Sequence, residues 1–286
     1  MSGLSQLRKG GGFTLVEMVM VIIILGILVL GVSSFVILGT RIFVESTSVD
    51  QVLSQSRFAI ERMTREIRNA VPNSLRLTNS ATYQCMEFMP IQASASYITL
   101  PIAPEVASKT GIINTPSQGI NTAHRMLVYP LTPTHIYSAS DEAIEARLLR
   151  VKEYDGATNT VTFGSATQEL AMRFSEASPR NRFFMVGTSV SYCFFVNGDV
   201  RRYGDYKLNA TQPAPGGDIN VKGNMGNGVL MAENVVITTT GTTTNWPISY
   251  TPGSLTNNAV VQLTPKFEVN GQAFQYQHQV QVVNVP

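Results

Sequence analysis

Charged residues are scarce in this chain. They account for 14% of its 286 residues, and the formal net charge is only +2. Removing Arg8 and Lys9, which precede a long apolar run, leaves 19 basic residues against 19 acidic residues. Proteins that bind nucleic acids depend on a clear excess of basic side chains, and this chain has none. We therefore expect no nucleic-acid partner.

Residue types that commonly build catalytic or metal sites are also few. The chain has two cysteines and three histidines, and the histidines are His124, His135 and His278. They show no metal-ligand spacing with cysteine or with one another, and no G-x-S-x-G nucleophile motif is present. A calcium site built from the oxygens of Asp218, Asn220 and Asn224 is an alternative. We predict that the protein is not an enzyme and holds no metal or cofactor.

Proline is absent from residues 13–71, so nothing in this segment breaks a long helix. Its first part, residues 18–40, has no charged side chain. At about 1.5 Å per residue this part is roughly 34 Å long, enough to cross a hydrocarbon core of about 30 Å. Beyond it, apolar residues recur at helical spacing as far as Val71, where Pro72 ends the pattern. The sequence predicts one helix over residues 14–71, apolar in its first half and amphipathic in its second.

Glu17 is an acidic residue near the start of this apolar segment. A lone carboxylate inside a membrane costs on the order of 2.5–3.5 kcal/mol, so it needs a positive partner. The apolar run itself supplies none. Cleavage after Gly12 would create an amino group on Phe13, four residues before Glu17. That amine would neutralise the carboxylate in the same chain or in a neighbouring one.

Residues 12–17, Gly-Phe-Thr-Leu-Val-Glu followed by the apolar run, resemble the leader region of type IV prepilins and secretion pseudopilins. The resemblance implies that a prepilin peptidase cuts between Gly12 and Phe13 and that Phe13 is then methylated on its amino group. It also implies that Glu17 pairs with a neighbour's N-terminus during filament assembly. The implied partners are the prepilin peptidase, the major pilin, other minor pilins, the inner-membrane assembly platform and, before assembly, the lipid bilayer.

Basic residues before the span favour a cytoplasmic leader. If the resemblance holds, the chain crosses a bacterial inner membrane once, with its head in the periplasm and later in a pilus at the cell surface. Disulfides form in the periplasm, so Cys85 and Cys193 are a candidate pair there. Two separate buried thiols are the alternative, because sequence does not place the two Cα atoms within bridging distance.

The predicted organisation is a leader at residues 1–12, a helix at 13–71 with a transmembrane segment at 18–40, and a β-rich head at 72–286. The fold class is α+β, with a mostly antiparallel head as in pilins. Strands are expected at residues 83–89, 125–129, 148–154, 160–163, 183–196 and 229–238. Asn197-Gly198 and Asn270-Gly271 predict hairpin turns between strands.

Two other head segments carry specific predictions. Residues 274–282 alternate apolar side chains with glutamines, which predicts one half-buried strand with His278 partly buried. Asp155-Gly156 predicts a turn, although residues 141–149, capped by Ser140, are an alternative short helix.

The head resembles those of broad-headed minor pilins and J-type pseudopilins, and within that group the minor pilin class of mannose-sensitive haemagglutinin (MSHA) pili. The resemblance rests on residues 190–201, 250–253 and 280–284. It implies a structural subunit that takes part in pilus assembly or priming. The alternatives are a J-type pseudopilin of a type II secretion system, a surface adhesin with a binding loop at residues 213–228, and a membrane-anchored periplasmic enzyme.

Overall fold

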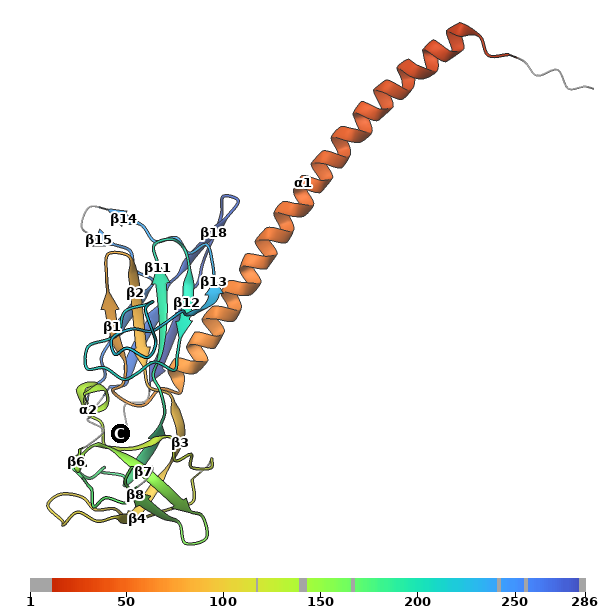
Figure 1. The fold of residues 1–286 in the computed structure, drawn as a ribbon. Coiled ribbons are helices and arrows are strands. Elements are labelled where there is room, and N and C mark those ends of the chain that lie inside the picture. Colours follow the sequence, from red (N-terminus) through yellow and green to blue (C-terminus); the bar gives the residue numbers. More distant parts are fainter. Residues whose placement is uncertain are drawn as a thin grey trace, which may run out of the picture. The chain divides into compact units, whose positions relative to one another are not determined.

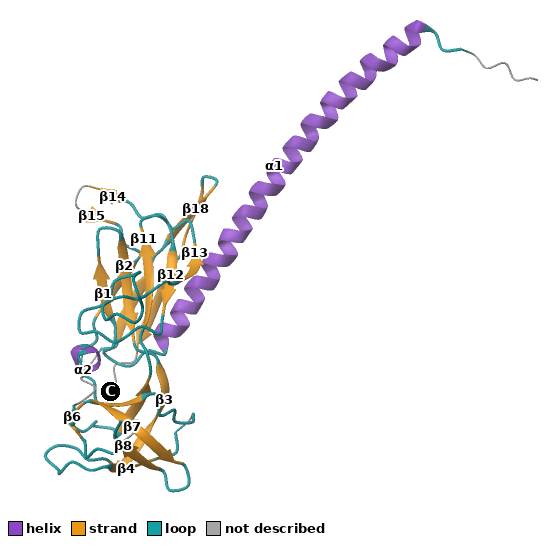
Figure 2. Cartoon of the chain, viewed as in Figure 1, coloured by secondary structure: helices purple, strands orange, loops and turns teal. Residues whose placement is uncertain are grey.

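The computed structural model describes residues 12–116, 118–138, 143–165, 168–240, 243–254 and 257–282, and Figure 2 distinguishes its helices from its strands. The chain divides into two compact units, Met1–Gln51 and Val52–Pro286. Most of the predicted leader, residues 1–11, lies outside the described residues.

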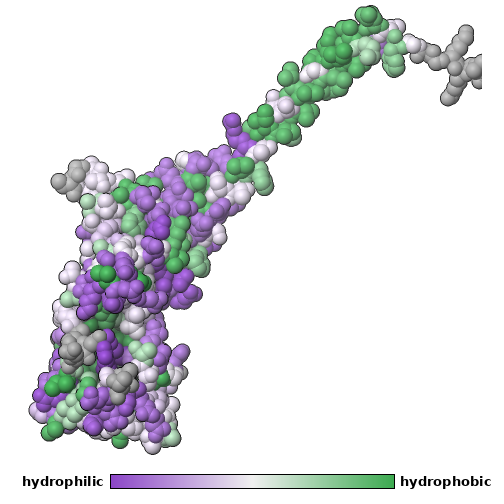
Figure 3. Space-filling view, viewed as in Figure 1, coloured by the Kyte–Doolittle hydropathy of each residue, from purple (hydrophilic) through white to green (hydrophobic). Residues whose placement is uncertain are grey.

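The described part of the first unit is almost entirely helical. α1 (Leu15–Arg68) starts in this unit and continues into the second, which confirms the predicted helix to within three residues at either end. Every side chain at residues 12–47 is exposed, and Figure 3 shows the N-terminal part of α1 as a nearly continuous apolar surface. Such a surface is stable only against lipid or other apolar helices.

In the second unit, α1 buries one face. The buried residues are Val52, Ser56, Ala59, Ile60, Met63, Thr64 and Ile67. The predicted apolar stripe is thus confirmed, but small and polar residues share the buried face. The Ser56 hydroxyl lies 2.9 Å from the hydroxyl of Tyr276, so burial of these two hydroxyls is compensated. α1 ends before Pro72 because the backbone then pairs with the strand region: the Val71 N–H donates to the Met89 carbonyl at 2.8 Å.

The larger sheet of the head has five antiparallel strands in the order β1-β2-β11-β12-β13 (Figure 1). They are β1 (Arg76–Asn79), β2 (Tyr83–Phe88), β11 (Val190–Phe195), β12 (Val200–Tyr203) and β13 (Val229–Ala232). The predicted Asn197-Gly198 turn joins β11 to β12, and Gly198 has a φ of 96°, which glycine adopts without strain. One face of this sheet shares a core with α1 residues from Val52 onward and with a second sheet.

The second sheet has the order β16-β17-β20, formed by β16 (Ile248–Thr251), β17 (Ala259–Leu263) and β20 (His278–Val282). Gln84 of β2 links it to the larger sheet. The Gln84 amide donates to the Ile248 carbonyl at 2.9 Å and accepts the Ile248 N–H at 2.8 Å. Gln84 is buried, and its side chain makes the two hydrogen bonds to the Ile248 backbone that a neighbouring strand would otherwise make.

A closed barrel forms a further part of the head, with its strands in the order β10-β3-β4-β8-β7-β5. They are β3 (Ile91–Thr99), β4 (Thr110–Ile113), β5 (Arg125–Val128), β7 (Leu148–Asp155), β8 (Thr160–Phe163) and β10 (Arg182–Val186). β3 pairs with β10 and then with β4, and its register shifts between Tyr97 and Thr99. β7 shifts likewise between Val151 and Glu153. Such irregularities bend a strand and allow a sheet to close into a barrel. Buried side chains fill the interior of this barrel.

The barrel is inserted between two neighbouring strands of the larger sheet. β2 and β11 pair with each other, with Phe88 opposite Val190, and the chain between them builds the barrel. Buried residues at the junction, including Val71, Met89 and Tyr137, form a separate apolar cluster that fixes the barrel to the rest of the head. No sequence pattern predicted this insertion.

The remaining elements are short. They are α2 (Thr134–Tyr137), β6 (Glu145–Ala146) paired with β9 (Arg173–Phe174), β14 (Thr239–Thr240) paired with β15 (Thr243–Thr244), and β18 (Lys266–Val269) paired with β19 (Gln272–Gln275). The β18–β19 pair confirms the predicted hairpin at Asn270-Gly271.

The predicted single strand at residues 274–282 is wrong. β19 ends at Gln275 and β20 begins at His278, because the Tyr276 N–H instead donates to the Pro265 carbonyl at 3.0 Å. The break places the two halves in different sheets and leaves His278 exposed, not partly buried as predicted.

Three other boundaries also differ from prediction. Residues 183–196 form two strands, because β10 belongs to the barrel and β11 to the larger sheet, and β13 ends at Ala232 instead of continuing to residue 238. The alternative helix at 141–149 is wrong for residues 143–149, where β6 and the start of β7 lie, and Ser140 is outside the described residues. The turn at Asp155-Gly156 is confirmed between β7 and β8.

The Gln84 link between the two sheets gives a first prediction. Gln84→Leu should lower the free energy of unfolding by about 2–4 kcal/mol, because a buried donor and a buried acceptor of Ile248 lose their partners. Urea unfolding of the full chain in detergent micelles measures this. Gln279→Leu, which changes an exposed glutamine of β20, is the matched control and should shift stability much less. Equal effects of the two substitutions would contradict the role given to Gln84.

Candidate functional site: the N-terminal assembly segment

The residues that carry the predicted processing site lie together at the start of α1. Gly12, Phe13 and Thr14 precede the helix, and Phe13 is 78% exposed. Apart from Gly12 and its chain neighbours, no described atom lies within 4 Å of the position that a Cβ on Gly12 would occupy. The described residues therefore leave the surroundings of Gly12 open.

Thr14 caps the helix, a role that the sequence reasoning missed. Its hydroxyl oxygen accepts the Glu17 N–H at 3.3 Å, and its carbonyl accepts the Met18 N–H at 3.2 Å. Thr-x-x-Glu is the capping-box pattern, so the sequence already contained a signal for it. Glu17 lies in the first turn of α1, where the helix dipole favours a negative charge. The segment thus brings the predicted cleavage residues and the acid to one end of one helix.

The helix that follows has the length and composition of a membrane span. α1 is the one helix among the described residues that meets both criteria, and the most apolar part of it is not buried within the protein. An apolar helix with a carboxylate one turn from its start is suited to insertion into lipid followed by a specific ionic contact.

Comparison with known families agrees with this geometry. The family model described as the prokaryotic N-terminal methylation motif matches residues 7–33. This motif places the chain among the type IV prepilin-like proteins. For a prepilin-like chain it implies processing by a prepilin peptidase, pilin partners in general and a single-pass membrane anchor. A search of curated proteins and a search of solved structures found no match.

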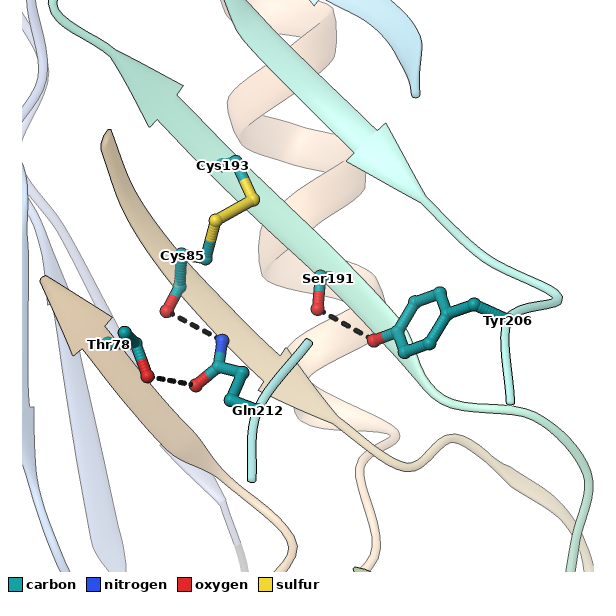
Figure 4. The surroundings of a disulfide bond; sticks show 6 residues. All are labelled: Thr78, Cys85, Ser191, Cys193, Tyr206 and Gln212. Atoms are coloured by element: carbon teal, nitrogen blue, oxygen red, sulfur yellow. Dashed lines mark hydrogen bonds between the residues drawn. A yellow bond between two sulfur atoms is a disulfide. The ribbon is translucent and has the colours of Figure 1, made fainter. Parts of the chain in front are cut away.

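The head of this prepilin-like chain holds a disulfide between Cys85 and Cys193, the two cysteines that the sequence offered as a pair or as separate thiols. They face each other on β2 and β11 and are fully buried. Figure 4 shows the surrounding contacts: Gln212 bridges Thr78 and the Cys85 carbonyl, and Tyr206 bonds to Ser191 at 2.7 Å. The segment after β12 thus covers the face of the sheet that carries the disulfide.

Glu66 links α1 to the larger sheet through salt bridges. Its carboxylate accepts hydrogen bonds from Arg62 and from Arg202 of β12, each at 2.9 Å. Burial alone would raise the pKa of Glu66, but the two guanidinium groups outweigh burial and hold that pKa below its usual value. The ionised carboxylate is therefore part of the folded state.

The other residues considered at the sequence level do not converge. Within the described ranges, no group of three or more His, Cys, Asp or Glu side chains is placed to hold a metal ion. The carboxylate of Asp218 accepts hydrogen bonds from the backbone and amide of Asn220, as in a local turn. His135 accepts the N–H of Leu131, and burial lowers the pKa of both His124 and His135.

The Glu66 contacts give a second prediction. A carboxyl whose folded pKa is depressed contributes stability above its unfolded pKa of 4.5 and loses that contribution as pH falls through the folded value. Glu66→Gln should therefore be less stable than the wild type at neutral pH and should lose less stability on acidification below about 4.5. Unfolding free energies measured at several pH values test this. Glu61→Gln, an exposed change on the same helix, should keep the wild-type slope, and a wild-type slope in Glu66→Gln would contradict the prediction.

Proposed function

We propose that this protein is a minor pilin, a structural subunit of an MSHA-like type IV pilus that takes part in pilus assembly or priming. In this proposal the chain is not an enzyme and binds no cofactor. A prepilin peptidase removes residues 1–12, and the amino group of Phe13 is methylated. The mature subunit waits in the bacterial inner membrane with its head in the periplasm, and then enters a pilus at the cell surface.

The observation that supports this proposal most directly is the placement of Glu17. It lies one turn from the Gly12–Phe13 junction, at the start of an apolar helix that offers it no cation. A buried carboxylate without a cation is costly, and a new N-terminal amine on a neighbouring subunit removes that cost. The same apolar surface that contacts lipid before assembly contacts neighbouring helices afterwards, so movement into a filament keeps it out of water.

The proposed partners follow from this movement. The prepilin peptidase and the lipid bilayer act on the subunit before assembly, and the inner-membrane assembly platform moves it out of the membrane. The major pilin and other minor pilins then surround α1. A J-type pseudopilin would use the same helix in a type II secretion system, so the two roles differ in the machine and not in the chemistry of the segment.

Cleavage and methylation give a third prediction. Mass spectrometry of the N-terminus of the protein isolated from its own cells should find N-methyl-Phe13 as the first residue. In cells that lack the prepilin peptidase the leader should remain. A functional subunit in pili that still begins at Met1 or Ser2 would overturn the proposal.

The role of Glu17 gives a fourth prediction. Glu17→Ala should leave membrane insertion intact and reduce incorporation into purified pili by about tenfold or more, since the lost ionic contact is worth on the order of 1–3 kcal/mol. Immunoblots of membrane and pilus fractions measure both quantities. Thr14→Ser is the matched control because it keeps a capping hydroxyl. Normal pilus entry of Glu17→Ala would refute the assembly mechanism, whereas a protein found only with a secretion machine would favour the pseudopilin role.

A further inference from the structure

A groove with a volume of about 1010 Å³ lies where the inserted barrel meets the rest of the head. One wall comes from the barrel side, from residues 123–125 and the end of α2. The other comes from residues 187–188 and 205–210, and Lys222 adds to it. The volume is at the upper end of the range usual for ligand sites. These segments are distant in sequence, and no short motif could have revealed the site.

The groove is positively charged. Among the described residues, its lining contains the cations Arg125, Lys207 and Lys222 and the carboxylate of Asp205. The Thr188 hydroxyl donates to Asp205 at 3.2 Å, and the Lys207 ammonium donates to the Asn220 carbonyl at 2.5 Å, which holds it in place. In a chain with a formal net charge of only +2, this is a local concentration of positive charge.

The segment that carries Lys207 is fixed from beneath by Arg76. The guanidinium of Arg76 donates to the carbonyls of Asn209 and Ala210 at 2.9 and 2.6 Å, and to the buried carboxylate of Glu87 at 2.6 Å. It also lies 3.7 Å from the centre of the Tyr137 ring. A guanidinium held by one carboxylate and two backbone carbonyls gives this segment a fixed support, so the position of Lys207 does not depend on a ligand.

Polar groups make up somewhat more than half of the accessible lining of the groove, and Leu208 is a half-buried apolar residue within it. Ser138, Thr188 and Asn209 add hydroxyl and amide groups to the lining, whereas Tyr137 and Tyr206 are only 3% and 1% exposed and their rings offer no aromatic anchor site. A peptide partner usually inserts aromatic or aliphatic anchors into apolar pockets. Charge and hydrogen bonding without an aromatic anchor site suit a ligand that carries both carboxylates and many hydroxyls.

We propose that this groove binds an acidic oligosaccharide, with its carboxylates on Lys207 and Lys222. Arg125 adds positive charge on the barrel side, and the hydroxyl-bearing residues contact the sugar hydroxyls. The site gives the subunit a ligand-binding role that is separate from filament assembly and needs neither Glu17 nor the processing of Phe13.

The test uses the full chain in nanodiscs of zwitterionic lipid, titrated with a short oligogalacturonate by calorimetry. We expect saturable binding that weakens with added salt and no binding of a neutral galactose oligomer of the same length. Lys207→Gln/Lys222→Gln should weaken binding by about tenfold. Asp205→Asn should strengthen it, a gain that a damaged fold does not produce.

The matched control is Lys109→Gln/Lys266→Gln, which removes the same charge from exposed lysines outside the groove and should leave the affinity within about twofold of wild type. Unfolding midpoints verify that all variants fold. An equal loss in both double variants would mean diffuse attraction and would overturn the proposal. Absence of saturable binding, or tighter binding of a polyglutamate peptide, would overturn it as well.

Discussion

An acidic side chain at the start of an apolar helix is the constraint on which the rest of this protein depends. Glu17 is tolerable at the membrane surface or beside a cation, and costly elsewhere. Thr14 satisfies the backbone N–H of Glu17 but supplies no charge to its side chain. The long uncharged segment that follows offers no cation to that acid, so a cationic partner has to come from outside the segment. The remaining described residues form a folded, β-rich head that follows this segment in the chain.

The N-terminal segment was predictable because its signals are local. Helix length, the absence of proline and the spacing of Gly12, Phe13 and Glu17 are read directly from adjacent residues, and α1 begins and ends close to the predicted limits. Tight turns were equally predictable from the sequence, since an Asn-Gly pair favours a two-residue hairpin turn. In the head, the sequence did not decide between a disulfide and two separate thiols for Cys85 and Cys193. Residues 108 positions apart meet only through long-range strand pairing.

The head was less predictable for the same reason. Alternation from Phe274 to Val282 looks like one strand, yet the chain changes sheets at Tyr276. The hydroxyl of Tyr276 bonds to Ser56 of α1, and its backbone N–H donates to the Pro265 carbonyl. Barrel closure depends on register shifts within β3 and β7 that no apolar pattern records. The basic groove requires five segments that are separate in sequence to meet, so its lysines look like ordinary surface residues in the sequence.

The place of the disulfide has a consequence for the integrity of the molecule. Cys85 and Cys193 lie on the two strands between which the barrel is inserted, so the whole barrel belongs to one covalent ring. A peptide bond broken anywhere in that ring leaves the anchor-bearing half and the C-terminal half joined through sulfur. The barrel can therefore suffer a proteolytic nick without the membrane anchor losing the rest of the head.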